Sequence, residues 1–242
     1  MAIRDKYKIE RRYIKKGKSR SGQRLEGLKP KFLVAHETAN NNASADDHFN
    51  YFNNHQPEAS AHTFIDENKI LEIIPLSEKA WHVQYQKTKD NEMFGSDAND
   101  VAIGVELCRP GRFSKAYDRY VWYFAYLCHE FELSPKEHIV AHSLLDPERR
   151  NDPQSWLKLH GVTWSQFLNS VDSYYNKWSV EEGSIFKDVP DDHWAIEEIK
   201  LLKEKGVLVG YPDGTFGLHK TVTREEFAVG LANLYKRIKS EK

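Results

Sequence analysis

The chain has 242 residues, enough for one large domain or two smaller ones, and 40% of them are hydrophobic, so it can bury a substantial core. Its formal net charge of -1 argues against nucleic acid as a partner. No apolar run is long enough to predict a membrane-spanning helix. The two cysteines, Cys108 and Cys128, lie in apolar surroundings and indicate buried thiols rather than a disulfide framework.

A basic segment opens the chain, because residues 1–31 contain 12 lysines and arginines against 3 acidic residues. We expect a solvated, partly mobile arm, and the alternative is an arm that binds an anionic polymer. The segment has no apolar stretch typical of a secretory signal, so we expect the protein to be made in the cytoplasm.

Apolar periodicity and turn residues then predict alternating strands and helices. The predicted elements of the first half are a strand at 31–38, a helix at 45–54 capped by Ser44, a β-hairpin at 59–66 and 69–74, and a surface loop at 87–100. Those of the second half are strands at 101–108 and 138–141 and helices at 115–133, 154–159 and 163–178. This alternation predicts an α/β domain over residues 1–178, with a mixed central β-sheet flanked by helices.

Composition changes at residues 179–184, which predict a linker. Residues 185–242 predict a second, small helical domain. Its expected elements are a helix at 193–206 that ends in a glycine cap, a tight turn region at 210–217 and a helix at 222–238. Thr223 and Glu226, three residues apart, predict a capping box at the start of the last helix.

Two polar residues near the end of the first domain suggest a metal site. His142 follows a short apolar strand, and Asp152 lies ten positions later in a polar loop. Zinc accepts imidazole nitrogen and carboxylate oxygen, and a catalytic zinc site has three protein ligands and a water. His36, which also ends an apolar strand, is the candidate for the third ligand. A histidine of this kind is, taken alone, more often a hydrogen-bonded core residue.

Glu106 is the one charged residue in the apolar strand at 101–108. A carboxylate on a core strand is costly unless it is paired or belongs to a functional site. Close to a bound zinc ion, it could accept the proton of the metal-bound water and pass it to a leaving amine.

These residues lie in sequence blocks that resemble a known family. Residues 31–160 resemble the type 2 N-acetylmuramoyl-L-alanine amidases, zinc enzymes related to phage lysins and peptidoglycan recognition proteins. The matching blocks, in order, are VAHET, SAHTFIDE, KAWHV, IGVELC and VAHSLLDPERRNDP. The resemblance implies that His36, His142 and Asp152 bind one zinc ion per chain and that Glu106 is the general base.

The resemblance also implies further site residues. The family has a lysine two residues before the last ligand, where this chain has Arg150, so an arginine would assist at the oxyanion, and the choice between Arg149 and Arg150 stays open. His62 and Trp81 match positions along the substrate groove. Their alternative role is packing beneath it.

The second domain resembles an S-layer homology module. The matching text is FKDVPDDHWA, GYPDGTFG and VTREEFAVGL. Such modules bind secondary cell-wall polysaccharide, which is often anionic. The resemblance implies that Trp194 and Arg224 contact the polymer and that Gly210 and Asp213 shape the loop. The alternatives are a core anchor for Trp194 and a helix start for Arg224. The family usually has three modules in tandem, so either the single module binds weakly or chains associate as a homo-oligomer through their tails.

Together these resemblances predict a peptidoglycan hydrolase that cleaves the amide between N-acetylmuramic acid and L-alanine of the stem peptide. The simplest form is a phage or prophage endolysin of a Gram-positive host, kept in the cytoplasm until a holin opens the membrane. One alternative is a non-catalytic peptidoglycan-recognition and wall-anchoring protein. The other is a structural S-layer-associated protein.

Overall fold

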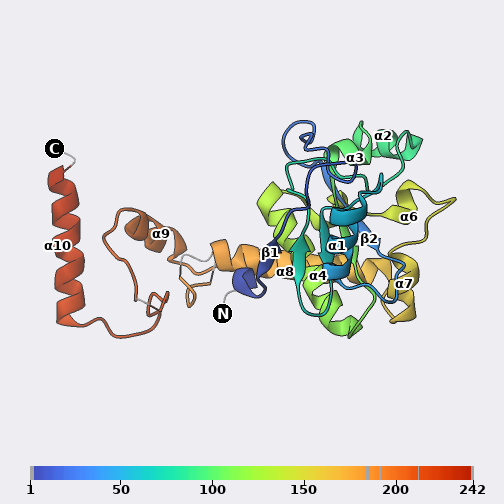
Figure 1. Ribbon diagram of the computed structural model, residues 1–242. Coiled ribbons are helices and arrows are strands. Elements are labelled where there is room, and N and C mark those ends of the chain that lie inside the picture. Colours follow the sequence, from blue (N-terminus) through green and yellow to red (C-terminus); the bar gives the residue numbers. More distant parts are fainter. Residues whose placement is uncertain (1–2, 184–185, 191, 212, 241–242) are drawn as a thin grey trace. The chain divides into compact units, whose positions relative to one another are not determined.

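The computed structural model describes residues 3–183, 186–190, 192–211 and 213–240. The chain divides into two compact units, Met1–Tyr175 and Asn176–Lys242. The first unit, drawn as a ribbon in Figure 1, contains a sheet of six strands in the order β1-β4-β3-β5-β2-β6. The strands are β1 (Ile9–Arg11), β2 (Phe32–Glu37), β3 (Thr63–Ile65), β4 (Ile70–Glu72), β5 (Ala102–Leu107) and β6 (Ile139–Ala141). The β3–β4 pair is antiparallel and all other pairs are parallel, which confirms the predicted mixed sheet.

Helices surround this sheet. They are η1 (Ile3–Asp5), α1 (Ala45–His55), α2 (Thr88–Phe94), α3 (Ala98–Val101), α4 (Phe113–Phe131), α5 (Pro135–His138), α6 (His142–Leu145), α7 (Gln154–Leu159) and α8 (Trp164–Gly183). The predicted start of α1 is confirmed, because the Ser44 side chain accepts from the Asp47 N–H and the Asp47 carboxylate accepts from the Ser44 N–H.

Helices α1 and α4 lie on opposite faces of the sheet, because side chains along the β3–β4 hairpin alternate between the two faces. Phe64 and Leu71 are paired across β3 and β4, and they pack in a core cluster that α1 covers. The neighbouring pair, Thr63 and Glu72, has side chains on the other face. There the Tyr123 hydroxyl of α4 lies 2.9 Å from Thr63 Oγ1 and 3.2 Å from Glu72 Oε1.

The basic N-terminal segment is part of the first unit, so the expected solvated and mobile arm is wrong. Its strand β1 pairs in parallel with β4, and Ile14, fully buried, continues the pairing through its N–H to the Ile73 carbonyl. Several of its cations pair with acidic groups of the same unit. Arg20, for example, donates two hydrogen bonds to the Glu78 carboxylate, at 2.7 and 2.8 Å.

One further expectation needs correction. Residues 87–100, expected to be a surface loop, form helices α2 and α3, and Asp90 and Asn99 in this segment are fully buried. Their side chains hydrogen-bond nearby backbone groups, which polarity along the sequence does not reveal. Of the segment expected to be a linker, residues 179–184, residues 179–183 form the last turns of α8 and residue 184 lies outside the described residues.

The second unit contains α9 (Ile196–Glu204) and α10 (Arg224–Ser240). Phe186, Val189, Ile196 and Ile199 form its small core. The predicted capping box of α10 is confirmed, because Thr223 N–H donates to Glu226 and Glu226 N–H donates to the Thr223 hydroxyl. Within the described parts of the chain, none of the helices has both the length and the apolar character to cross a bilayer.

Candidate metal centre and its cavity

Three parallel strands bring the predicted site residues to one edge of the sheet. His36 and Glu106 are direct partners across β2 and β5, so their side chains lie on the same face. The strand β6 pairs with β2 on its other side, and His142 follows it as the first residue of α6. The carboxyl ends of parallel strands are a common location for ligand sites in open α/β sheets.

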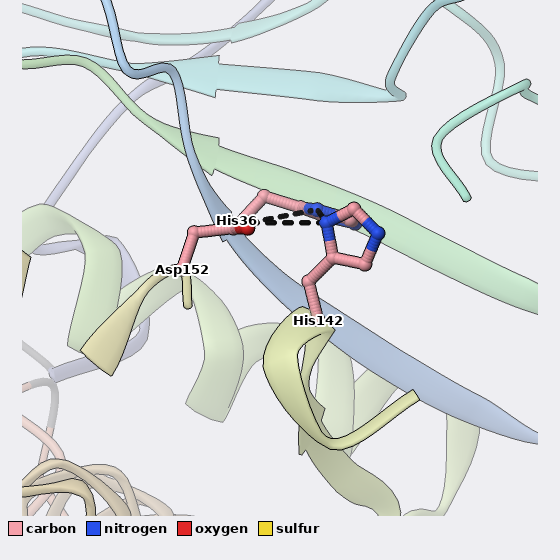
Figure 2. Close-up of side chains that lie close together, drawn as sticks. All are labelled: His36, His142 and Asp152. Carbon is pink, nitrogen blue, oxygen red and sulfur yellow. Dashed lines mark hydrogen bonds and ion pairs between the residues drawn. The ribbon is translucent and has the colours of Figure 1, made fainter. Parts of the chain in front are cut away.

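The donor atoms of His36, His142 and Asp152 converge (Figure 2). The Nδ1 atoms of the two histidines are 3.0 Å apart, and Asp152 Oδ2 lies 3.1 Å from His142 Nδ1 and 3.4 Å from His36 Nδ1. All three residues are buried. The Asp152 carbonyl accepts a hydrogen bond from the Ser143 N–H at 3.0 Å, which ties its loop to α6.

This triangle fits a zinc ion. Tetrahedral zinc has ligand bonds of about 2.0–2.2 Å, so neighbouring donors should lie about 3.3–3.5 Å apart. The observed separations of 3.0, 3.1 and 3.4 Å need only small adjustments. Two imidazole nitrogens and one carboxylate oxygen also match the donor types that zinc accepts, and they leave a fourth position for water.

Electrostatics also suit a cation. Burial and the neighbouring His142 lower the pKa of His36 to about 4, against the opposing effect of Asp152, so its imidazole is neutral at neutral pH. Burial acts to raise the pKa of Asp152, but hydrogen bonds and charge interactions with His142 and His36 lower it well below its usual value. At neutral pH, His36 therefore offers a lone pair and Asp152 offers a carboxylate. Neither group has to lose a proton before a cation binds.

Glu106 lies half-buried in the wall of a cavity of about 440 Å³ that also contains the three donors. Its Oε2 has no hydrogen-bond partner among the described residues. Burial, and then the carboxylates of Asp152 and Glu37, raise the pKa of Glu106 well above its usual value, while Arg150 acts in the opposite direction. A carboxyl group with a raised pKa next to a reaction site is suited to proton transfer near neutral pH.

The two arginines of the loop differ. Arg149 donates from Nε to Asp146 at 2.8 Å, and the buried Asp146 also pairs with Lys87 at 2.9 Å. Arg150 also lines the cavity, and among the described residues its side chain has no hydrogen bond or ion pair. This geometry leaves the Arg150 guanidinium available to a ligand in the cavity.

With this geometry, the comparisons with known proteins identify the first unit. A family model described as N-acetylmuramoyl-L-alanine amidase matches residues 26–155, more than half of the chain. The chain belongs to the N-acetylmuramoyl-L-alanine amidase family. A model of the S-layer homology domain matches residues 185–228. We call the first unit the amidase domain and the second the S-layer homology unit.

Individual relatives agree with this division. N-acetylmuramoyl-L-alanine amidase BlyA of Bacillus subtilis is 36% identical over 177 residues, which are 69% of this chain and 47% of that protein. The chain thus spans about half the length of this relative. A solved structure of a mutant endolysin from Bacillus subtilis is 26% identical, with a TM-score of 0.56, over 68% of this chain and 99% of that one. A cellulosome-anchoring protein of Acetivibrio thermocellus is 54% identical over 43 residues, which are 18% of this chain and 10% of that protein.

The two residues expected along the groove of the amidase domain lie in different environments. Trp81 lines the cavity, and its indole N–H donates to the Lys18 carbonyl at 2.8 Å. His62 is fully buried, with Nε2 2.9 Å from the Glu78 carbonyl and Nδ1 accepting from the Gly104 N–H at 3.1 Å. Because both of its ring nitrogens are occupied, His62 packs beneath the groove, and its expected role in substrate contact is wrong.

Sequence reasoning missed His82, which directly follows Trp81 in the AWHV block. Its Nδ1 lies 3.0 Å from Nε2 of His36, and it lines the same cavity. The signal that could have drawn attention to it is a third histidine in a buried, apolar block of a chain that already offers two candidate histidine ligands.

In the S-layer homology unit the expected polymer contacts lie on the surface. Trp194 is 87% exposed, which excludes the alternative role as a core anchor, and Arg224 is exposed at the start of α10. Asp213 accepts hydrogen bonds from the N–H and hydroxyl of Thr215. Gly210 has φ +69°, and a Cβ there would lie 2.3 Å from the Phe186 ring, so this turn requires glycine.

Proposed function

We propose that the chain is a zinc-dependent peptidoglycan hydrolase that cleaves the amide bond between N-acetylmuramic acid and the first L-alanine of the stem peptide. The observation that supports this most directly is the convergence of His36, His142 and Asp152 in one cavity. Glu106, the register partner of His36, adds a carboxyl group suited to proton transfer. Membership of the amidase family supports the same bond as the point of cleavage.

Each site residue has a distinct role in this proposal. Bound zinc, one ion per chain, would polarise the scissile carbonyl and lower the pKa of its water to about 7. Glu106 accepts the proton of the attacking water and passes it to the departing amine. Arg150 donates hydrogen bonds to the carbonyl oxygen as it becomes negative. Trp81 contacts the muramyl-peptide at the cavity.

The first test is zinc content and wall clearing measured on one purified sample, before and after chelation. We expect about one zinc per chain, and clearing that is lost with the metal and returns with added zinc. Zinc without hydrolysis of any wall or soluble muramyl-peptide would favour a non-catalytic recognition protein. No bound zinc would refute the proposed site.

We propose that the S-layer homology unit binds secondary cell-wall polysaccharide. The 87% exposure of Trp194 and the exposed guanidinium of Arg224 support this, because an aromatic face can stack on a sugar ring and a guanidinium pairs with carboxylates. We expect Arg224→Ala to weaken sedimentation with purified walls while cleavage of a soluble muramyl-peptide is unchanged. Equal wall binding by both proteins would contradict this assignment.

A single S-layer homology unit also raises the question of association between chains. Four exposed apolar residues of α10 recur at spacings of four, three and four, which is the pattern of a coiled-coil seam: Phe227, Leu231, Leu234 and Ile238. The first turn of α10 is acidic and its last turn is basic, so an antiparallel pair would bring opposite charges together. We propose that two chains associate through this helix. Sedimentation equilibrium should show a dimer that Leu231→Glu converts to monomer, and a monomeric wild type would refute it.

We propose finally that the protein acts at the cell wall as a phage or prophage endolysin. Its similarity to an endolysin from Bacillus subtilis supports this. Expression in the cytoplasm of a Gram-positive host should cause lysis only when a holin is expressed with it. Lysis without a holin would contradict this route of release.

A further inference from the structure

His36 has a second histidine behind it. Nδ1 of His36 faces His142 and Asp152, while its Nε2 lies 3.0 Å from Nδ1 of His82. The rings of His36 and His82 meet edge to face at an interplanar angle of 84°. His82 does not belong to the three converging donors, and its hydrogen bond to the centre is the one to His36.

The direction of this hydrogen bond depends on which nitrogen of His36 is protonated. A neutral imidazole has one N–H and one lone pair, and a metal ligand must offer the lone pair. If Nδ1 of His36 is to bind a metal, its proton must lie on Nε2, and Nε2–H then donates to His82 Nδ1. The reverse arrangement, with His82 donating, would place a proton on the Nδ1 of His36 and block it as a ligand.

The structure holds His82 firmly in this position. The Asn99 side chain, fully buried, accepts hydrogen bonds from the backbone N–H groups of His82 and Val83 at 2.9 and 3.0 Å. Gly104 lies under the ring, where a Cβ would be 2.5 Å from Cγ of His82. Any side chain at position 104 would therefore push the ring away from its place behind His36.

His142 has no equivalent support. Its Nδ1 lies 3.1 Å from Asp152, and its Nε2 has no hydrogen-bond partner among the described residues. No described side chain behind the ring of His142 therefore fixes which of its nitrogens carries the proton. Of the two histidines, His36 is the one with a hydrogen-bond partner on the ring nitrogen that faces away from the centre.

We propose that His82 is a positioning residue that accepts the Nε2 proton of His36 and so presets the Nδ1 of His36 as a metal ligand. This inference rests on the proposed zinc site, since the site explains why the tautomer matters. Removal of such a partner behind a metal-bound histidine typically lowers metal affinity about 10- to 100-fold.

The test compares three substitutions of His82 in the full chain. Asparagine can place its carbonyl oxygen near the position of Nδ1, whereas glutamine reaches the position of Nε2 and alanine offers no acceptor. We expect zinc affinity, measured by competition with a chromophoric chelator, to fall about 10- to 100-fold in His82→Ala and His82→Gln. His82→Asn should lose less. His55→Ala, which removes an exposed histidine outside the cavity, should bind zinc as the wild type does.

A second measurement does not depend on zinc. Long-range ¹H–¹⁵N correlation spectra of the metal-free protein should show His36 with its proton on Nε2, and this tautomer should be lost in His82→Gln and kept in His82→Asn. Gly104→Ala, which displaces the ring without removing it, should lower zinc affinity in the same direction as His82→Ala.

Two results would overturn the role of His82. One is unchanged zinc affinity in His82→Ala. The other is an equal loss of zinc affinity with all three substitutions, because the loss would then come from the changed size of the side chain and not from the missing hydrogen-bond acceptor. If the wild type bound no zinc but kept the Nε2–H tautomer, the proposed function would fail while the positioning role of His82 would be supported.

Discussion

Replacement of Glu106 by glutamine tests the division of roles at the centre. The Glu106 side chain lies beside His36 in register but is not one of the three converging donors, so Glu106→Gln should keep zinc. Glutamine has nearly the same shape but cannot accept a proton from water. A positioned general base contributes about 10²–10⁴-fold to a rate. This corresponds to about 2.7–5.4 kcal/mol of barrier, at 1.36 kcal/mol for each factor of ten.

Stability should not fall in this variant. Burial and nearby carboxylates raise the pKa of Glu106 well above its usual value, so the folded metal-free protein disfavours the charged form of this side chain. Glutamine is neutral and does not carry this cost. The free energy of unfolding of the chelated variant, measured in urea at neutral pH, should therefore equal or exceed that of the wild type.

The assay is cleavage of a soluble muramyl-peptide, with zinc content measured on the same sample. Glu58→Gln is a matched control, because Glu58 lines the same cavity but is 80% exposed and pairs with Lys18 at 3.2 Å. We expect the control to stay close to the wild type. Full activity in Glu106→Gln would refute the role of Glu106 as the base, and loss of zinc would show that it belongs to the ligand set.

Three other predictions concern the loop, the core and the second unit. Arg150→Ala should lower the turnover rate about 10²–10³-fold, which is typical for loss of an oxyanion donor. Arg149→Ala should mainly destabilise the loop, because Arg149 ties it to Asp146. Equal turnover rates in the two variants would contradict this division of roles. Burial lowers the pKa of His62 to about 4, below its unfolded value of 6.5, so the unfolded state binds more protons between these values. The midpoint for urea unfolding of the chelated protein should therefore fall as the pH drops from about 6.5 to about 4, and less so in His62→Gln. Deletion of residues 186–242 should weaken sedimentation with walls and spare cleavage of a soluble muramyl-peptide; loss of both would show that the amidase domain depends on the second unit.

Local signals in the sequence were sufficient for much of the fold. Capping residues predicted the starts of α1 and α10, because a cap depends on residues only three positions apart. Apolar stretches predicted β2 and β5, and strand ends drew attention to His36 and His142. The sequence blocks around these residues predicted the amidase family, which the comparison with its family model confirms.

Only the tertiary structure decided the contacts between distant segments. The charge of the N-terminal segment suggested a solvated arm, but β1 adds to the sheet beside β4, since backbone pairing and buried Ile14 outweigh the cost of ordering it. His62 and Trp81 lie in similar blocks, yet one packs beneath the groove and the other lines it.

The pairing of His36 with His82 joins residues 46 positions apart, and no local pattern predicts it. The sequence by itself determined the donor types and the strands that present them. The structure decided which side chains meet. The register of β2 against β5 sets the position of His36. The buried Asn99 holds the backbone of His82, and Gly104, which has no side chain, leaves room for the His82 ring.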